Sequence, residues 1–340
     1  MFNLQVFNRL VCVALLSLLA AGGFSLAACG NEHAHGTKHS DDCGVSVSGE
    51  RVSDRPSVGL ALGGGGMRGA AHAGVLRVLL REGIPIDYVA GTSMGAVVGG
   101  LLSAGVHPDE IEKRFTEGSL MHSFLTVPLS VRMAAIPLFA LPRIFGVRGY
   151  EGFYKGNKFR NYLDRMMPQC AHEIEALPIP FCAVAVNLLD GKEYAVKSGN
   201  LGKAMQASCA VPILRRPVQV DGKLLVDGGV LVNLPVEHAR AMGADIVIAV
   251  DVDERPGTVE ESEFKRLGSV AHRVLTLSLW KIDEGQRHAA DIVIHPEVNG
   301  IGLISTKRED AVSAIKAGEK AAEAAIPQIR LLLEEKAKKH

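Results

Sequence analysis

The feature that most restricts the fold is the pentapeptide Gly91-Thr92-Ser93-Met94-Gly95, which lies between an apolar run and a helical pattern. Residues 86–90 are typical of a short buried strand, and residues 94–104 of a helix. A serine at such a turn is held in a strained backbone conformation that exposes its hydroxyl, and the flanking glycines let strand and helix pack closely. The pattern predicts a nucleophile elbow at Ser93, although an ordinary N-cap serine would give the same local pattern.

A glycine-rich turn lies upstream of this elbow. Residues 57–62 have the pattern of a buried strand and residues 68–81 that of a helix, and the turn between them contains Gly64, Gly65 and Gly66. Such a turn exposes backbone N–H groups at the positive end of the following helix, where a developing oxyanion would be stabilised. The turn therefore predicts an anion-binding loop ahead of the nucleophile.

An aspartate stands at the end of a later strand. Asp221-Gly222 is typical of a hairpin turn, and the outgoing strand runs through residues 224–226 into Asp227-Gly228-Gly229. The carboxylate of Asp227 is thus placed at a strand end with no bulky residue after it. This position makes Asp227 a candidate base.

In this order, the motifs resemble those of the patatin-like phospholipase family. The family motifs G-G-G-x-R-G, G-x-S-x-G, A-S-x-A-x-P and D-G-[GA] match residues 64–69, 91–95, 207–212 and 227–229. The resemblance extends from about Pro56 to about Ala324. It implies an α/β fold with three layers, in which a mostly parallel central sheet carries helices on both faces.

The resemblance also implies the site residues and the reaction. Ser93 and Asp227 would form a catalytic dyad; the oxyanion hole would contain Gly64, Gly65, Gly66 and Arg68, and the elbow and base motifs would need Gly91, Gly95, Gly228 and Gly229. We expect Arg68 to brace the hole, although it could also steer a phosphate. The reaction would release fatty acid from phospholipid or lysophospholipid without a cofactor. Because a free aspartate, with a pKa of about 3.9, is a weak base, the site would need a desolvated Asp227 and strong oxyanion stabilisation.

Other interpretations of the same residues stay open. A serine–aspartate–histidine triad would be compatible with the chain order, because four histidines follow Asp227: His238, His272, His288 and His295. None lies in a glycine-flanked loop, so we expect them to be structural or solvated, and we expect His72 to pack beneath the glycine loop. Gly64, Gly66 and Gly69 also satisfy a dinucleotide-binding fingerprint, with Asp87 18 residues after Gly69. A general carboxylesterase or thioesterase and a non-catalytic lipid-binding lipoprotein are further alternatives.

The first 28 residues have the pattern of a signal peptide, with Arg9 before an apolar stretch over residues 10–20. They end in Leu26-Ala27-Ala28-Cys29, which resembles a bacterial lipobox with Cys29 as the lipidated residue. We therefore expect an exported protein that is anchored through lipid to a membrane facing the periplasm, most simply the outer membrane. Residues 29–55 are polar and predict a flexible tether. Its residues His33, His35 and His39 could bind metal weakly, but a solvated tether is favoured and no metal site is predicted.

The body of the protein is predicted to occupy residues 56–324, with a C-terminal helix and tail over residues 325–340. Strands alternate with helices, which indicates a parallel sheet covered on both faces. A single helical stretch is expected over residues 263–287, a last strand at 292–294, and helix from residue 307 onward. Residues 119–150 interrupt this rhythm with apolar side chains, three prolines and the basic residues Arg132, Arg143 and Arg148. This insertion is expected either to cap the core or to contact anionic lipid.

The 37 basic and 37 acidic residues balance, so no net field favours a nucleic-acid partner. The expected partner is a membrane phospholipid or another acyl-ester lipid, and nothing in the sequence indicates the oligomeric state. An exported compartment permits disulfides, but the spacing of Cys43, Cys170, Cys182 and Cys209 indicates no pairing, and we expect no structural disulfide.

Overall fold

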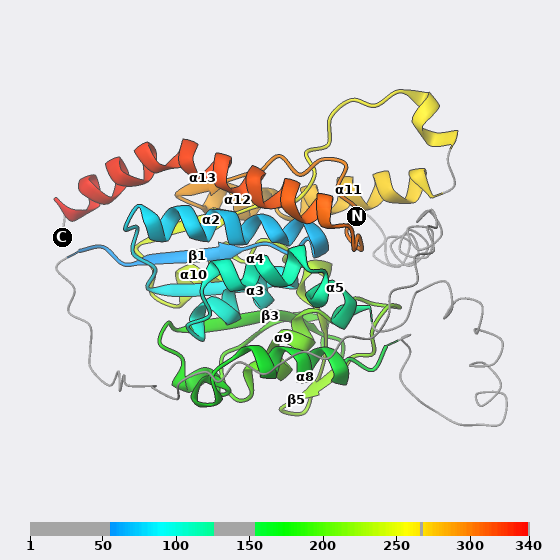
Figure 1. Ribbon diagram of the computed structural model, residues 1–340, viewed down its shortest axis with the longest axis horizontal. Helices are drawn as coiled ribbons and strands as arrows, with labels where there is room; N and C mark the ends of the chain where they lie inside the picture. Colours follow the sequence, from blue (N-terminus) through cyan, green and yellow to red (C-terminus); the bar gives the residue numbers. More distant parts are fainter. Residues whose placement is uncertain (1–54, 126–153, 266–267, 339–340) are drawn as a thin grey trace.

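The computed structural model describes residues 55–125, 154–265 and 268–338 (Figure 1). Within these residues eight strands form one sheet in the order β5-β6-β3-β2-β1-β7-β8, and β4 pairs with β3. The strands are β1 (Val58–Leu62), β2 (Tyr88–Thr92), β3 (Phe181–Asn187), β4 (Lys192–Val196), β5 (Val218–Val220), β6 (Lys223–Asp227), β7 (Ile246–Val250) and β8 (Ile292–Ile294).

The sheet has a parallel part and an antiparallel part. β1 pairs in parallel with β2 and β7, β2 with β3, and β7 with β8, whereas β3 is antiparallel to β4 and β6, and β5 to β6. One hairpin turns at Asp190-Gly191, where an Asp-Gly pair is typical of such a turn, and the other at Asp221-Gly222, as predicted. In the second turn both residues have positive φ, 47° and 75°, which is the conformation of a type I′ turn.

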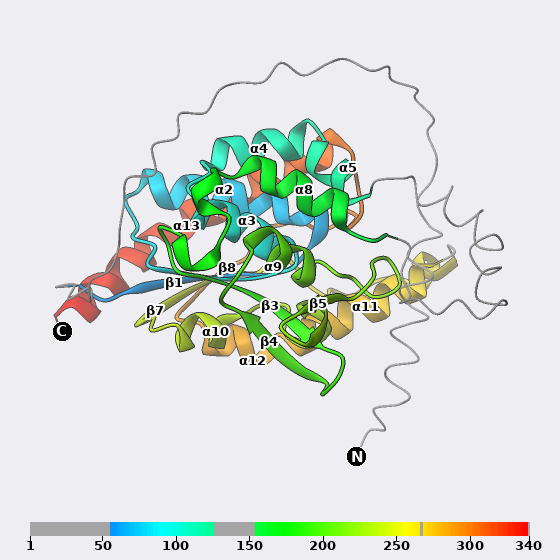
Figure 2. The ribbon, with the colours of Figure 1, turned by 90° about the horizontal axis from the view of Figure 1, so that it is seen from below.

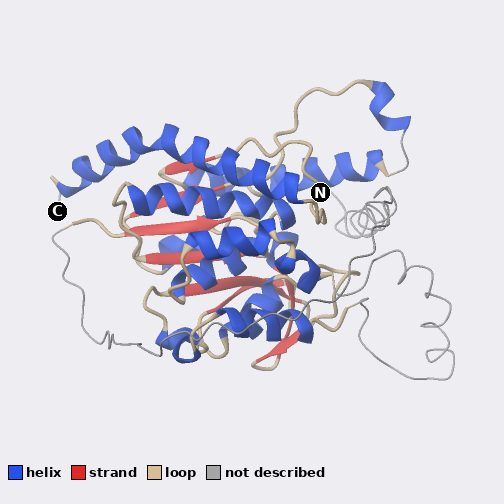
Figure 3. Cartoon of the chain, viewed as in Figure 1, coloured by secondary structure: helices blue, strands red, loops and turns tan. Residues whose placement is uncertain are grey.

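Helices cover both faces of the sheet (Figures 2 and 3). One face carries α2 (Ala70–Arg81), α3 (Met94–Ser103), α4 (Pro108–Thr116), α5 (Ser119–Phe124), α8 (Asn157–Met166), α9 (Leu201–Ser208) and α13 (Arg308–Ala337). The other carries α10 (Val236–Ala241) and α12 (Glu284–Ala289), which α11 (Ser269–Ile282) precedes. Successive side chains of a strand point to opposite faces of the sheet. In β1, Leu60 and Leu62 therefore belong to one apolar core and Ala61 to the other. The predicted three-layer α/β fold with a mostly parallel sheet is confirmed.

Two predicted elements differ in the structure. The helical stretch expected over residues 263–287 is divided at Asp283, because the buried carboxylate of Asp283 binds backbone N–H groups of Asn233 and Leu234. The second strand begins at Tyr88 rather than residue 86, since Asp87 bonds Arg55 and the N–H of Val58.

The boundary predicted at residue 324 lies inside a helix. α13 continues from Arg308 to Ala337, and Ile326 and Ile329 are buried in the same core as the sheet. The C-terminal helix therefore belongs to the body of the protein. None of the helices in the described residues is long and apolar enough to cross a bilayer.

Several predictions concern residues outside the described ranges. They include the signal peptide and Cys29, the tether with its histidines, and the part of the 119–150 insertion that carries Arg132, Arg143 and Arg148. Among the described cysteines, Cys182 and Cys209 are buried free thiols, whereas Cys170 is disulfide-bonded. The expectation of no disulfide was therefore wrong for Cys170, since spacing in the sequence does not show which thiols lie close in space.

Candidate active site

Ser93 lies at a strained turn between β2 and α3. Its φ of 52° and ψ of −121° are unusual for a residue with a side chain, and such a backbone typically costs about 1–3 kcal/mol. The flanking glycines are required by close packing, because a Cβ atom on Gly91 would lie 2.5 Å from Cα of Ala96, and one on Gly95 would lie 2.1 Å from the carbonyl oxygen of Leu62. The backbone has the conformation that the elbow motif predicts.

A buried hydroxyl anchors this turn. The N–H of Ser93 donates to Oγ of Ser208 at 2.8 Å, and that hydroxyl donates in turn to the carbonyl oxygen of Val184 at 2.6 Å. Ser208 is fully buried at the end of α9, so the elbow is tied to β3 by one side chain.

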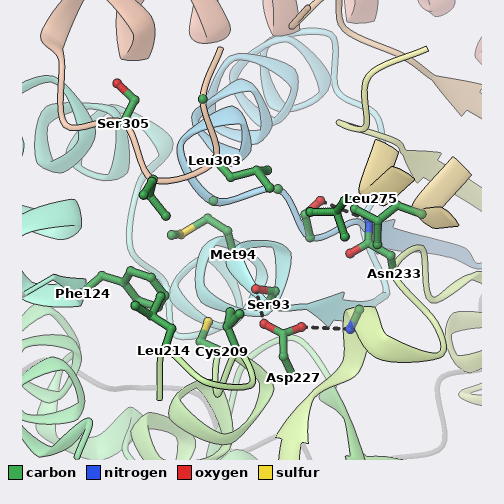
Figure 4. A pocket seen from close by; sticks show the side chains of 18 of the residues that line it. Ser93, Met94, Phe124, Cys209, Leu214, Asp227, Asn233, Leu275, Leu303 and Ser305 are labelled. Carbon is green, nitrogen blue, oxygen red and sulfur yellow. Dashed lines mark hydrogen bonds between the residues drawn. The ribbon is translucent and has the colours of Figure 1, made fainter. Parts of the chain in front are cut away.

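β3 brings the serine and the aspartate together. Thr92, the last residue of β2, pairs with Val184, and Asp227, the last residue of β6, pairs with the next residue, Ala185. β2 runs parallel to β3 and β6 runs antiparallel to it, so their carboxyl ends meet at consecutive positions. Oγ of Ser93 donates a hydrogen bond to Oδ2 of Asp227 at 2.7 Å (Figure 4).

The environment makes Asp227 more basic than a free aspartate. Burial raises the pKa of Asp227 to about 6, and this is opposed by the N–H of Gly229, which donates to Oδ1 at 2.9 Å, by the Ser93 hydroxyl and by the charge of Arg215. Arg215 is itself buried, with its guanidinium over the rings of Phe124 and Phe159. Asp227 is therefore mostly ionised at neutral pH, yet basic enough to take a proton from a hydroxyl.

The glycine loop is held by bonds along most of its length. The N–H of Gly63 donates to Val250, and that of Gly64 to the carbonyl oxygen of Asn233, at 3.0 and 3.1 Å. Burial lowers the pKa of His72 to about 4, so its neutral ring donates from Nε2 to the carbonyl oxygen of Gly63 at 2.8 Å. His72 thus lies against the loop, as predicted.

Two N–H groups of the loop remain available. Across residues 55–125, 154–265 and 268–338, no acceptor is present for the N–H of Gly65 or Gly66, and both residues line the pocket that contains Ser93. These two are the candidate oxyanion donors. The prediction that Gly64 donates to the oxyanion needs correction, because its N–H already donates to the carbonyl oxygen of Asn233.

Arg68 braces the loop from outside the pocket. Its side chain is 3% exposed, its Nε donates to the carbonyl oxygen of Ile301 at 2.7 Å, and its Nη2 forms a 3.0 Å ion pair with Glu254. The neighbouring N–H of Met67 donates to Leu303 at 2.9 Å. Arg68 therefore fixes the loop to residues 301–303 and is not placed to bind a substrate phosphate.

The site opens into a mainly apolar pocket of about 700 Å³ (Figure 4). Its apolar lining includes Met94, Phe124, Val211, Pro212, Leu214, Val230, Leu275, Leu279, Leu303 and Ile304. The volume lies within the range of small-molecule sites. Polar side chains, among them Ser93, Asp227, Ser305 and Lys307, line the same pocket, so it combines apolar walls with polar groups, as expected of a site for an amphipathic substrate.

The alternatives to the dyad find little support. His272 lines the pocket, but its Nε2 lies 3.5 Å from Glu254, and His295 pairs with the buried Asp251 at 3.4 Å. Asp87, required for a dinucleotide site, precedes β2 and bonds Arg55 at 2.8 and 2.9 Å. It lies at the opposite end of the parallel strands from the glycine loop, which follows β1. No cluster of three metal-ligating side chains occurs in the described part of the chain.

Comparison with known proteins agrees with this geometry. The family model described as patatin-like phospholipase matches residues 60–240, which contain the glycine loop, the elbow and Asp227. The chain belongs to the patatin-like phospholipase family.

Its relatives include an uncharacterized NTE family protein of Mycobacterium tuberculosis, 38% identical over 203 residues, which cover 60% of this chain and 51% of that protein. The lysophospholipase NTE1 of Mycosarcoma maydis is 35% identical over 224 residues, which cover 66% of this chain and 10% of the fungal protein. This chain spans about half the length of the first of these relatives. A solved structure of VipD from Legionella pneumophila aligns with 81% of this chain and 67% of its own, at 15% identity and a TM-score of 0.44.

Sequence reasoning missed two residues of the site. Asn233 binds the glycine loop, and Asp283 binds the backbone of Asn233. No motif marks either residue, and Asp283 lies inside the helical stretch predicted over residues 263–287. The only available signal was that Asn233 is a polar residue between Val232 and Leu234, six positions after the base.

Proposed function

We propose that this protein is a serine acyl hydrolase that releases fatty acid from phospholipid or lysophospholipid. The observation that carries the proposal is the 2.7 Å hydrogen bond from Ser93 to a buried Asp227 at the end of an apolar pocket. A hydroxyl on a strained elbow, bonded to a desolvated carboxylate, is the arrangement that activates a serine nucleophile.

In the proposed reaction, Asp227 takes the proton of the Ser93 hydroxyl as Oγ attacks the ester carbonyl carbon. The carbonyl oxygen becomes negative and accepts hydrogen bonds from the N–H groups of Gly65 and Gly66, which are already fixed in place. The tetrahedral intermediate then expels the alcohol, which receives the proton from Asp227, and an acyl-enzyme remains. Water attacks the acyl-enzyme in the same way, so that fatty acid leaves and Ser93 regains its proton.

The lining of the pocket supports a lipid substrate. Ten of its residues are apolar, and an acyl chain would bury its surface there, at about 0.8 kcal/mol for each methylene group. The name of the fungal relative, a lysophospholipase, supports a single-chain lipid as one substrate. We further propose that the protein is exported and anchored through lipid at Cys29, because the Leu26-Ala27-Ala28-Cys29 sequence resembles a lipobox.

The test is a panel of phospholipid, lysophospholipid, neutral lipid, short-chain ester and thioester, assayed with wild type, Ser93→Ala and Asp227→Asn. Each variant should lose about 10⁴-fold or more in kcat, and the double variant should be little worse than either, because the two residues act as a unit. His272→Ala, which removes a histidine that lines the pocket, should lose less than about tenfold in kcat. A His272→Ala protein as inactive as Ser93→Ala would overturn the dyad, and a wild type that releases no acyl group from any substrate would overturn the function.

A further inference from the structure

One buried side chain joins the two loops of the site. Asn233 is 5% exposed and lines the same pocket as Ser93 and Asp227 (Figure 4). Its carbonyl oxygen accepts the N–H of Gly64 at 3.1 Å, and its Nδ2 donates to the carbonyl oxygen of Gly64 at 3.3 Å. One residue therefore binds both backbone polar groups of Gly64, directly before the free N–H groups of Gly65 and Gly66.

The amide of Asn233 also lies between the glycine loop and residues 227–229, here called the base loop. A Cβ atom on Gly64 would lie 2.4 Å from Oδ1 of Asn233, and one on Gly229 would lie 3.0 Å from the same oxygen. Gly229 donates its N–H to Asp227, so the amide oxygen of Asn233 lies beside the residue that orients the base. The glycines of both motifs leave room for this one amide.

Asn233 is held in place from behind. The carboxylate of Asp283, fully buried at the junction of α11 and α12, accepts the N–H groups of Asn233 and Leu234 at 3.0 and 2.9 Å. The second hydrogen of Nδ2 donates to Oδ2 of Asp253 at 3.2 Å. Both hydrogens of the amide are therefore used by the protein, and none is left for a substrate.

We propose that Asn233 is a positioning residue, which holds the glycine loop against the base loop so that the N–H groups of Gly65 and Gly66 point at the oxygen that becomes negative. The inference rests on the proposed function and deepens it. Asn233 makes no contact with the reacting atoms and acts through the loop. Because an oxyanion hole works only if its donors are fixed before the reaction, a loop that is free to turn would lose rate without losing substrate binding.

The experiment measures kcat and KM of Asn233→Ala on a soluble short-chain ester. Misplacement of reacting groups by about 1 Å costs about 100-fold, so we expect kcat to fall by about that factor while KM stays within about threefold. The contacts of Asp227 with Ser93 and Gly229 remain, so the acid limb of the pH profile should not move. Exchange of the backbone amides of residues 60–69, followed by mass spectrometry, should become faster in Asn233→Ala.

Asn187→Ala is the matched control. Asn187 is also 5% exposed, and its Oδ1 accepts the N–H groups of Leu189 and Leu224 at 3.3 and 3.1 Å, outside the pocket. This variant should lose thermal stability but keep kcat within about threefold. If Asn187→Ala loses as much kcat as Asn233→Ala, the effect is general destabilisation and the positioning role is overturned.

Asn233→Asp tests the same contacts if the alanine variant does not fold. It keeps the volume and one oxygen but replaces the Nδ2 donor by an oxygen facing Gly64 and Asp253, and it should lose at least as much kcat. Either variant with kcat within about threefold of wild type overturns the proposal. If the wild type cleaves no ester, the proposed function is overturned independently of Asn233. The positioning role is then tested by the backbone amide exchange of residues 60–69 alone, and exchange in Asn233→Ala that equals the wild-type exchange overturns it.

Discussion

At the scale of single residues, burial makes Asp227 more basic than an ordinary, solvated aspartate. The pKa of Asp227 is raised to about 6 by burial, while the Gly229 N–H, the Ser93 hydroxyl and the charge of Arg215 keep it from rising further. A base of this strength is still ionised at neutral pH, and it accepts a proton more readily than a solvated aspartate. Under the proposed mechanism, Asp227 would then activate Ser93 without a histidine.

The pH dependence of the reaction follows from this. Asp227 must be ionised to accept a proton, so kcat/KM for a soluble ester should fall as the pH drops below about 6. Arg215→Met removes a positive charge that favours the ionised form, so the pKa of Asp227 should rise and the acid limb should move to higher pH. The measurement is the pH profile of kcat/KM for both proteins. An acid limb near pH 4 in wild type, or a shift to lower pH in Arg215→Met, would contradict this account.

At the scale of elements, the sequence predicts the structures that are formed by residues close together in the chain. The elbow, the glycine loop and the two Asp-Gly hairpins each lie within a few residues of chain, and the structure contains all of them. The sequence does not show that β6 runs antiparallel to β3, which places Asp227 and Thr92 opposite neighbouring residues of β3. Strand pairing of this kind depends on packing between segments that are far apart in the chain. It also does not show that the N–H of Asn233 donates to Asp283, 50 residues away, or that the N–H of Gly64 donates to the carbonyl oxygen of Asn233.

The contact between α2 and α13 permits a test at this scale. A Cβ atom on Gly318 would lie 2.1 Å from the carbonyl oxygen of Ala71, and one on Gly74 would lie 2.1 Å from that of Ile315, so the two helices touch backbone to backbone. Gly318→Ala should force them apart and lower the free energy of unfolding by about 1–3 kcal/mol, despite the better helix propensity of alanine.

Gly285→Ala is the control for this substitution. Gly285 lies in α12 with no atom within 4 Å of its added Cβ, so alanine should stabilise the protein by about 0.5–1 kcal/mol. Urea unfolding of the two variants and wild type measures both effects. If Gly318→Ala is as stable as Gly285→Ala, the helices are not held as closely as the structure indicates.

At the scale of the whole molecule, the proposed reacting groups come from one part of the chain, whereas the pocket walls come from two. Ser93, Asp227 and the glycine loop lie within residues 60–240, the part that matches the family model. Leu275, Leu279, Leu303 and Ile304, which line the pocket, lie beyond it. Arg68 joins the two parts through Ile301 and Glu254. We infer that the residues beyond the shared region contribute to the choice of lipid, together with the wall residues inside it.

The last prediction concerns where this molecule meets its lipid. If Cys29 is the lipidated first residue of the mature chain, Cys29→Ser should leave the protein in the soluble fraction or unprocessed, because the variant lacks the thiol to which the membrane-anchoring lipid would be attached. Ser93, Asp227 and the pocket are distant from Cys29 in the sequence, so hydrolysis of a soluble short-chain ester should be unchanged, while release of fatty acid from membranes in the cell should decrease. Fractionation and mass spectrometry of the native protein measure the first effect, and paired assays measure the second. An unmodified residue 29 in the membrane fraction of the wild type would show that another part of the chain provides the attachment.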